Sequence, residues 1–109
     1  MILEVAHLDV KPGQSRAFEA AFAQAQLIIS SMPGYAGHEL RPCIENPSRN
    51  LLPVHRERLE DYTQGFRGSP EYRQWEALLH HFYEPFPAVE HYGASLVVES
   101  GAKDYHHGE

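Results

Sequence analysis

The chain has 109 residues, of which 42% are hydrophobic and 22% charged, and its formal net charge is −6 at pH 7. This length and composition are typical of one globular domain with a small core. The acidic balance and the scattered arginines argue against a nucleic-acid partner, whose phosphates require a basic face. No apolar run approaches the roughly 18 residues that span a bilayer, and the N-terminus does not have the pattern of a signal peptide. We therefore expect a cytoplasmic protein with no membrane partner.

The first half of the chain predicts the order strand, helix, strand, strand. Residues 1–10 alternate as an apolar strand that is expected to be central. Apolar residues at helical spacing indicate a helix over residues 12–30. Residues 35–44 and 50–57 then predict two further strands. Because Pro53 cannot donate to a ladder, the third strand is expected at a sheet edge or at a bulge.

The second half predicts two helices and a strand. A short helix is expected where Tyr62 and Phe66 recur at helical spacing. A second helix begins at Pro70, because Ser69 can accept a hydrogen bond from an unpaired amide and proline suits the first helical position. A fourth strand is expected over residues 91–98. The predicted domain therefore covers residues 1–98, and a polar tail covers residues 99–109.

The helix that begins at Pro70 carries a broad apolar stripe, which must bury against another element. The stripe consists of Tyr72, Trp75, Leu78, Leu79 and Phe82. On the helical wheel His81 borders this stripe, whereas His80 is turned away from it. His81 is therefore the histidine of this pair that we expect at a cavity.

This order of elements is the split βαβ pattern of an α+β ferredoxin-like sandwich: a four-stranded antiparallel sheet with helices on one face. The other face of the sheet needs a cover. The first strand is apolar on both faces, and a small domain commonly covers such a face by pairing with a second copy. A homodimer through the sheet face is therefore predicted.

Three stretches suggest a family. They are MILEVAHLDVKPG at the start, SMPGYAGHEL after the first helix and GFRGSPEYRQWEALLHHFYEPFPAVEHY near the end. They closely resemble the antibiotic biosynthesis monooxygenase (ABM) domain family, in register over about residues 1–93. The resemblance implies a dimeric α+β barrel of ferredoxin-like subunits. It also implies several chemistries, because some members oxidise anthrones or related phenols to quinones with oxygen and no metal or flavin, others degrade haem, and many have no established activity.

The quinone-forming members carry an asparagine, a tryptophan and a tyrosine, and the matching positions here are Tyr62, Phe66 and Tyr72. Only the tyrosine is kept, and it either donates to a substrate oxygen or packs in the core. His7, on the central strand, either bonds a neighbouring group or acts as a general base toward a phenol. The predicted catalytic residues are Tyr72, His7 and Tyr62. The predicted substrate-binding residues are Phe66, Trp75, His81 and His38.

The haem-degrading members pair an asparagine on the first strand with a tryptophan on the short helix and a ligating histidine on the last helix. The matching positions here are His7, Phe66 and a position near Glu76, so none of the three is kept. A shift of one helical turn would bring His80 into the third place, although the wheel turns His80 away from the stripe. The eight histidines show none of the local spacings that hold a metal ion, and the lone Cys43 lies in no catalytic-thiol motif. We therefore expect no metal. The resemblance to the quinone-forming members implies no cofactor, with haem as the alternative.

Two classes of function follow. The first is a cofactor-independent monooxygenase that oxidises an electron-rich aromatic, anthrone-like or hydroquinone-like, with oxygen. It needs a pocket for a flat ligand, polar groups that favour the ionised substrate, and exclusion of water. The alternative is a dimer that binds or degrades haem, or that binds a small ligand without turnover. A small aromatic molecule is the expected partner in the first class.

Overall fold

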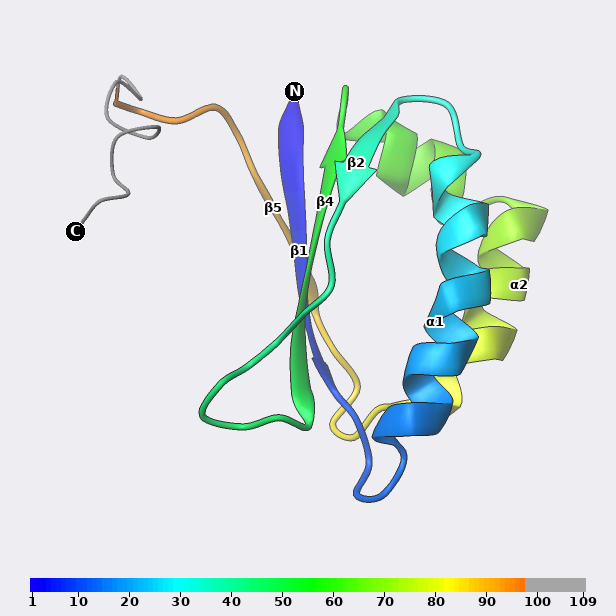
Figure 1. Ribbon diagram of the computed structural model, residues 1–109. Helices are drawn as coiled ribbons and strands as arrows, with labels where there is room; N and C mark the ends of the chain where they lie inside the picture. The colour runs from blue at the N-terminus through cyan, green and yellow to red at the C-terminus, as the bar shows by residue number, and fades with distance from the viewer. Residues whose placement is uncertain (98–109) are drawn as a thin grey trace.

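One antiparallel sheet carries both long helices on the same face in the computed structural model, which describes residues 1–97 (Figure 1). Neighbouring strands in the sheet follow the order β2-β4-β1-β5, and β3 pairs with β4. The strands are β1 (Ile2–Asp9), β2 (Tyr35–His38), β3 (Arg41–Pro42), β4 (Arg49–Arg56) and β5 (Val89–Tyr92). The predicted ferredoxin-like sandwich is confirmed. The predicted tail over residues 99–109, and the last residue of the predicted fourth strand, lie outside the described residues.

The central strand β1 places alternate residues on opposite faces of the sheet, as predicted. Ala6 and Leu8 are buried on the helix-bearing face, where Leu52 and Val54 of β4 join them. The register sets Ala6 opposite Leu52. The same alternation turns the odd-numbered residues of β1 toward the face without helices.

Both helices bury one apolar face against the sheet. Helix α1 (Ser15–Ser30) begins three residues after the predicted start, since the turn before it holds Gly13 at a φ of +76°. It buries Phe18, Phe22, Ala25 and Ile29. Helix α2 (Pro70–Leu79) begins where predicted, and the Ser69 hydroxyl accepts a hydrogen bond from the Tyr72 amide at 3.1 Å. A single 3-10 turn, η2 (His80–Phe82), continues it.

The prediction that Pro53 lies at a sheet edge or at a bulge is wrong, because it lies in the inner strand β4 and in unbroken register with β1. The register shift in this sheet falls between Tyr35 and Gly37 of β2. In an antiparallel ladder the N–H and C=O of one residue point to the same neighbouring strand. The Pro53 carbonyl accepts from the Glu39 amide at 3.1 Å, and Glu39 falls in the gap between β2 and β3. The Pro53 nitrogen, which carries no hydrogen, therefore points to the place where the neighbouring strand is interrupted between β2 and β3.

The turn after α1 packs against the short helix η1 (Asp61–Phe66), which has the wide π-helical form. Gly34 has a φ of +85°, and a Cβ at this position would overlap the Asp61 carboxylate. That carboxylate also accepts a hydrogen bond from the Arg58 amide at 2.9 Å. Glycine at position 34 thus permits close contact between the turn and the start of η1.

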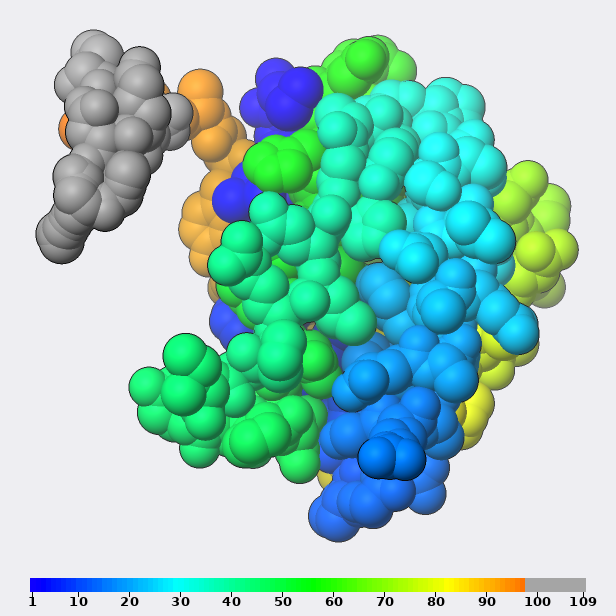
Figure 2. Space-filling model, in the orientation of Figure 1, coloured from blue at the N-terminus to red at the C-terminus, as the bar shows by residue number. Residues whose placement is uncertain are grey.

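Among residues 1–97, no helix covers the face of the sheet opposite α1 and α2. The segment between β3 and β4 projects past it, and so do residues 93–97 after β5 (Figures 1 and 2). Large apolar side chains in these segments are exposed, among them Ile44, Leu96 and Val97. Within residues 1–97, no helix combines the length and apolarity needed to cross a membrane.

Candidate functional site

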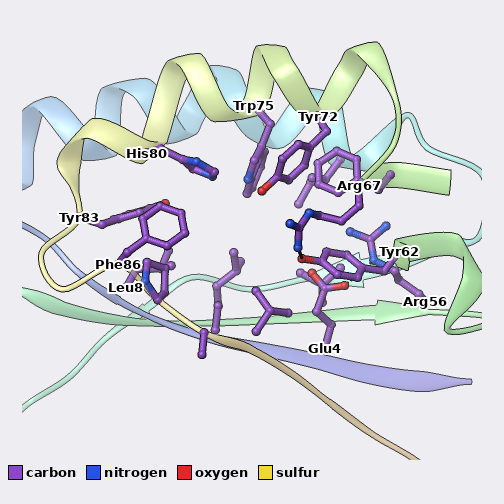
Figure 3. Close-up of a pocket in the computed structure, with 18 residues that line it drawn as sticks. Glu4, Leu8, Arg56, Tyr62, Arg67, Tyr72, Trp75, His80, Tyr83 and Phe86 are labelled. Carbon is purple, nitrogen blue, oxygen red and sulfur yellow. Dashed lines mark hydrogen bonds and ion pairs between the residues drawn. The ribbon is translucent and has the colours of Figure 1, made fainter. Parts of the chain in front are cut away.

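A cavity of about 290 Å³ lies between the helix-bearing face of the sheet and helix α2 (Figure 3). Its floor is formed by β1 and β4, and its roof by η1, α2 and η2. Residues 86–89, which lead into β5, close one side. The close-up shows Glu4 rising from the sheet while Trp75, Tyr72 and His80 point down from the helical side. The cavity thus joins elements from both halves of the chain.

Aromatic side chains form much of the roof. The Phe66 ring meets Trp75 edge-on at a centroid distance of 5.8 Å and meets Tyr72 in the same manner at 5.1 Å. At the other end, Phe86 lies 4.8 Å from the His80 ring. Such walls suit a flat apolar ligand, which can stack on one ring and meet the edge of another.

His80 is the imidazole on the cavity wall. Its Nδ1 lies 3.5 Å from Glu76 Oε2, one helical turn earlier on α2. Burial lowers the pKa of His80 below its ordinary value of 6.5, although the Glu76 carboxylate opposes this shift and Arg67 adds to it. His80 is therefore neutral at neutral pH, which is the form that can accept a proton.

His81 points away from the cavity, so the expectation that His81 and not His80 would line it is wrong. His81 is exposed, and the cavity wall does not include it. The wheel that predicted its position assumed α-helical spacing past Leu79. The chain instead tightens to a 3-10 turn at His80, with three residues per turn, and this rotates both side chains from their α-helical directions.

Tyr72 and Tyr83 both line the cavity. Burial raises the pKa of each phenol above 10, and Arg67 opposes the shift at Tyr72. Both groups therefore stay protonated at neutral pH. A neutral phenol can donate a hydrogen bond to an oxygen of the ligand and accept one in return.

Charged side chains gather at the end of the cavity near η1 (Figure 3). Arg56 is 0% exposed, and its Nε donates to Glu4 Oε1 at 2.7 Å. Its guanidinium carbon lies 5.6 Å from the ring centroid of Tyr62 and 5.2 Å from that of Phe66. Arg67 Nη1 donates a long hydrogen bond of 3.5 Å to the Tyr62 hydroxyl.

The structure brings together four of the residues that were singled out in the sequence. Tyr62, Phe66, Tyr72 and Trp75 all line the cavity. Their location follows from the predicted short helix and the apolar stripe of the next one. The individual roles predicted for them stay predictions.

His7 and His38 lie outside the cavity, which contradicts their predicted place in the site. His7 is exposed on the opposite face of the sheet, since Ala6 and Leu8 on either side of it point inward. Both ring nitrogens of His38 are engaged: the Tyr35 hydroxyl donates to Nδ1 at 2.6 Å, and Nε2 donates to Gln26 Oε1 at 3.0 Å. Neither imidazole faces the ligand space.

Sequence reasoning missed several residues of the cavity. They are Glu4, Arg56, Arg67, His80, Tyr83 and Phe86. One signal was available for the buried pair, because Glu4 shares the strand parity of Ala6 and Leu8. Arg56 likewise shares the parity of Leu52 and Val54. Two opposite charges on the inward face of neighbouring strands indicate a buried polar site.

The cavity volume favours a small organic ligand over haem. A cavity of about 150 Å³ is enough for one benzene ring, so about 290 Å³ suits one or two rings and falls short of a tetrapyrrole. The His80 ring is also engaged on two sides, since its Nδ1 lies 3.5 Å from Glu76 Oε2 and its centroid lies 4.8 Å from that of Phe86. Among residues 1–97, no group of three or more candidate side chains is arranged to hold a metal ion.

Comparison with known proteins gives consistent results. A model of the family described as antibiotic biosynthesis monooxygenase (ABM) matches residues 1–78. The protein YczJ of Bacillus subtilis (strain 168), described as uncharacterized, is 54% identical over 92 residues, which are 84% of this chain and 97% of YczJ.

Solved structures agree. A structure from Bordetella bronchiseptica that carries the family's name matches with a TM-score of 0.82 at 33% identity, over 87% of this chain and 97% of that one. SnoaB, a cofactor-independent oxygenase from Streptomyces nogalater, matches with a TM-score of 0.76 over 90% of this chain and 96% of its own. Because the two sequences are only 13% identical, this match shows that the two proteins share a fold and nothing more.

Proposed function

Since this chain belongs to the antibiotic biosynthesis monooxygenase family, we propose that it oxidises a small electron-rich aromatic with molecular oxygen and without a cofactor. The observation that carries the proposal is the pairing of a neutral imidazole with neutral tyrosine hydroxyls inside an aromatic-walled cavity. The relationship in fold to SnoaB, a cofactor-independent oxygenase, adds support.

The proposed reaction begins with removal of a proton from a phenol. His80 accepts this proton, and the Glu76 carboxylate at 3.5 Å stabilises the imidazolium that forms. Tyr72 donates to the phenolate oxygen and holds the ring in place. The electron-rich phenolate then supplies electrons to oxygen directly, so the protein needs to provide only position, proton transfer and a water-poor space.

The atoms balance for a monooxygenase. A carbon of the ring forms a bond to one oxygen atom of O₂ and loses its hydrogen. The phenol hydroxyl also loses its hydrogen. The other oxygen atom leaves with these two hydrogens as water, and the product is a quinone. An oxidase that only dehydrogenates a hydroquinone would release hydrogen peroxide instead.

The test is oxygen uptake by chelator-treated protein with 1-naphthol and anthrone, against a protein-free control. We expect one quinone per O₂ consumed and, with ¹⁸O₂, one labelled oxygen in the quinone. His80→Gln should lower kcat by about 100-fold or more, because general base catalysis contributes factors of this size. The matched control is His81→Gln, which changes the exposed neighbouring histidine and should leave kcat unchanged.

The result decides between the two classes of function. Uptake no faster than autoxidation, from protein that binds these aromatics, would contradict the oxygenase and favour a ligand-binding role. Equal losses in His80→Gln and His81→Gln would leave the oxygenase standing and remove His80 as its base.

A further inference from the structure

The cavity is positively charged although the chain is acidic. The formal charges on its wall come from two arginines and one glutamate, whereas the whole chain carries a net charge of −6. Figure 3 shows Arg56, Arg67 and Glu4 together at the η1 end, with His80 and Tyr83 at the opposite end. The wall therefore has a cationic end and a neutral end.

Arg56 has more hydrogen-bonding capacity than its surroundings use. Its Nε is paired with Glu4, but neither Nη1 nor Nη2 has a partner among the described residues. A buried guanidinium with unpaired N–H groups is costly, and native proteins rarely keep one without a reason. Its guanidinium carbon lies over the Tyr62 and Phe66 rings and the side chain is fully buried, so its charge is not screened by bulk water.

Arg67 is placed to touch a ligand directly. It lies on the cavity wall, its side chain is exposed, and its guanidinium carbon lies 5.4 Å from the Tyr72 ring centroid. Within residues 1–97, its hydrogen-bond partner is the Tyr62 hydroxyl at 3.5 Å, which leaves most of its five donors for another acceptor. A planar guanidinium binds a carboxylate through two parallel hydrogen bonds.

We propose that the substrate is a one- or two-ring phenol carrying an anionic oxygen group such as a carboxylate, which Arg67 binds at the η1 end of the cavity with Arg56 beneath it. The size follows from a volume of about 290 Å³, roughly twice the space that holds one benzene ring. This inference rests on the proposed function, since it takes the same cavity as the substrate site.

The arrangement also sets the orientation of the substrate. An acidic group held by Arg67 leaves the rings along Tyr72 and Trp75 and directs the far end toward His80 (Figure 3). The phenol hydroxyl at that far end meets the base. Arg67 is thus a binding residue that positions the phenol for proton transfer.

The test compares two probes of the same shape by calorimetry. They are 6-hydroxy-2-naphthoate, which is anionic, and 6-hydroxy-2-naphthamide, which is neutral. We expect the wild-type protein to bind the carboxylate at least about 10-fold more tightly than the amide, the size of effect that one charge-assisted hydrogen bond gives. Arg67→Gln should reduce this preference to about twofold or less.

Three further variants sharpen the result. Arg73→Gln, an exposed arginine of α2 outside the cavity, should keep the full preference. Arg67→Lys should keep part of it, since the charge remains while the planar fork is lost. Glu4→Gln/Arg56→Met removes the buried pair as a unit and should lower the preference at least about threefold.

Equal binding of the two probes, or a preference that survives in Arg67→Gln, would overturn the inference. Oxygen uptake on the same proteins separates it from the proposed function. Uptake of 1-naphthol without any preference for the anion would overturn only the substrate class. A preference that depends on Arg67, without any uptake, would overturn only the oxygenase.

Discussion

The position of His80 on the cavity wall depends on where α2 ends. Because the helix tightens after Leu79, the ring meets Tyr72 and Phe86 at centroid distances of 5.8 and 4.8 Å. Burial there disfavours the charged imidazolium and lowers the pKa of His80. The Glu76 carboxylate favours the imidazolium and so opposes this shift. The balance keeps a neutral base in contact with the cavity.

The pH dependence of oxygen uptake should report this balance. Only neutral His80 accepts a proton, so kcat should rise with pH through a value below 6.5 and stay constant above it. Glu76→Gln removes the group that raises the pKa of His80, so the acidic limb should move to lower pH. Glu71→Gln, on the first turn of the same helix and outside the cavity, is the control. A limb that stays in place in Glu76→Gln would contradict this role.

At the scale of single residues, the sequence predicted those side chains whose direction depends on regular geometry. Two helices carry the examples. Tyr62 and Phe66 lie four residues apart on η1, and Tyr72 and Trp75 lie three residues apart on α2. All four line the cavity. His80 could not be placed in this way, because the switch from α to 3-10 geometry has no mark in local sequence. The alternation of β1 places His7 on the face opposite Ala6 and Leu8, so its predicted catalytic role conflicts with the parity of its own strand.

Among the elements, α2 depends on its first turn. The Ser69 hydroxyl accepts from the Tyr72 amide at 3.1 Å and donates to the Phe66 carbonyl at 2.7 Å. It therefore joins the end of η1 to the start of α2. These two elements carry the aromatic roof of the cavity, so this cap fixes the spacing of the roof.

Ser69→Ala should lower the free energy of unfolding by about 1 kcal/mol, the usual loss for an N-cap side chain. Urea unfolding followed by circular dichroism measures it. Ser69→Thr keeps a hydroxyl in the same place and should lose less than about 0.5 kcal/mol. Equal losses in the two variants would show that the hydroxyl does not act as a cap.

Element types and order were predictable because each has a local cause. The proline at the first position of α2 and the alternation of β1 are examples. The position of a strand in the sheet has no such cause. Pro53 argued for an edge, but the gap between β2 and β3 lets an inner strand tolerate it. That gap is a property of the neighbouring strands and leaves no mark in the residues around Pro53.

At the scale of the whole molecule, the face of the sheet that the described helices leave uncovered needs a partner. Four apolar residues on it are only half-buried in the single chain: Leu3, Val5, Leu51 and Pro53. Exposed Ile44 and Leu96 lie on the segments that project past this face. We propose that a second copy of the chain covers it, because an incompletely buried apolar face flanked by two projecting apolar segments suits a twofold pair.

Val5→Lys tests this dimer. Val5 stands opposite Pro53 on this face, so a buried lysine there would cost several kcal/mol and should produce a folded monomer. Light scattering at micromolar concentration measures the mass. Leu27→Lys introduces the same charge on the exposed face of α1 and should leave the dimer intact. A monomeric wild-type protein would rule the proposal out.

The glycine in the turn after α1 has a consequence for how this cavity can change during evolution. Gly34 touches no ligand space, yet any side chain there would press on Asp61, the first residue of the helix that carries Tyr62 and Phe66. The turn at Gly34 thus supports the roof of the cavity through its contact with Asp61 at the start of η1. Substitutions outside the cavity can reshape it, and changes in ligand preference need not begin among the residues that line it.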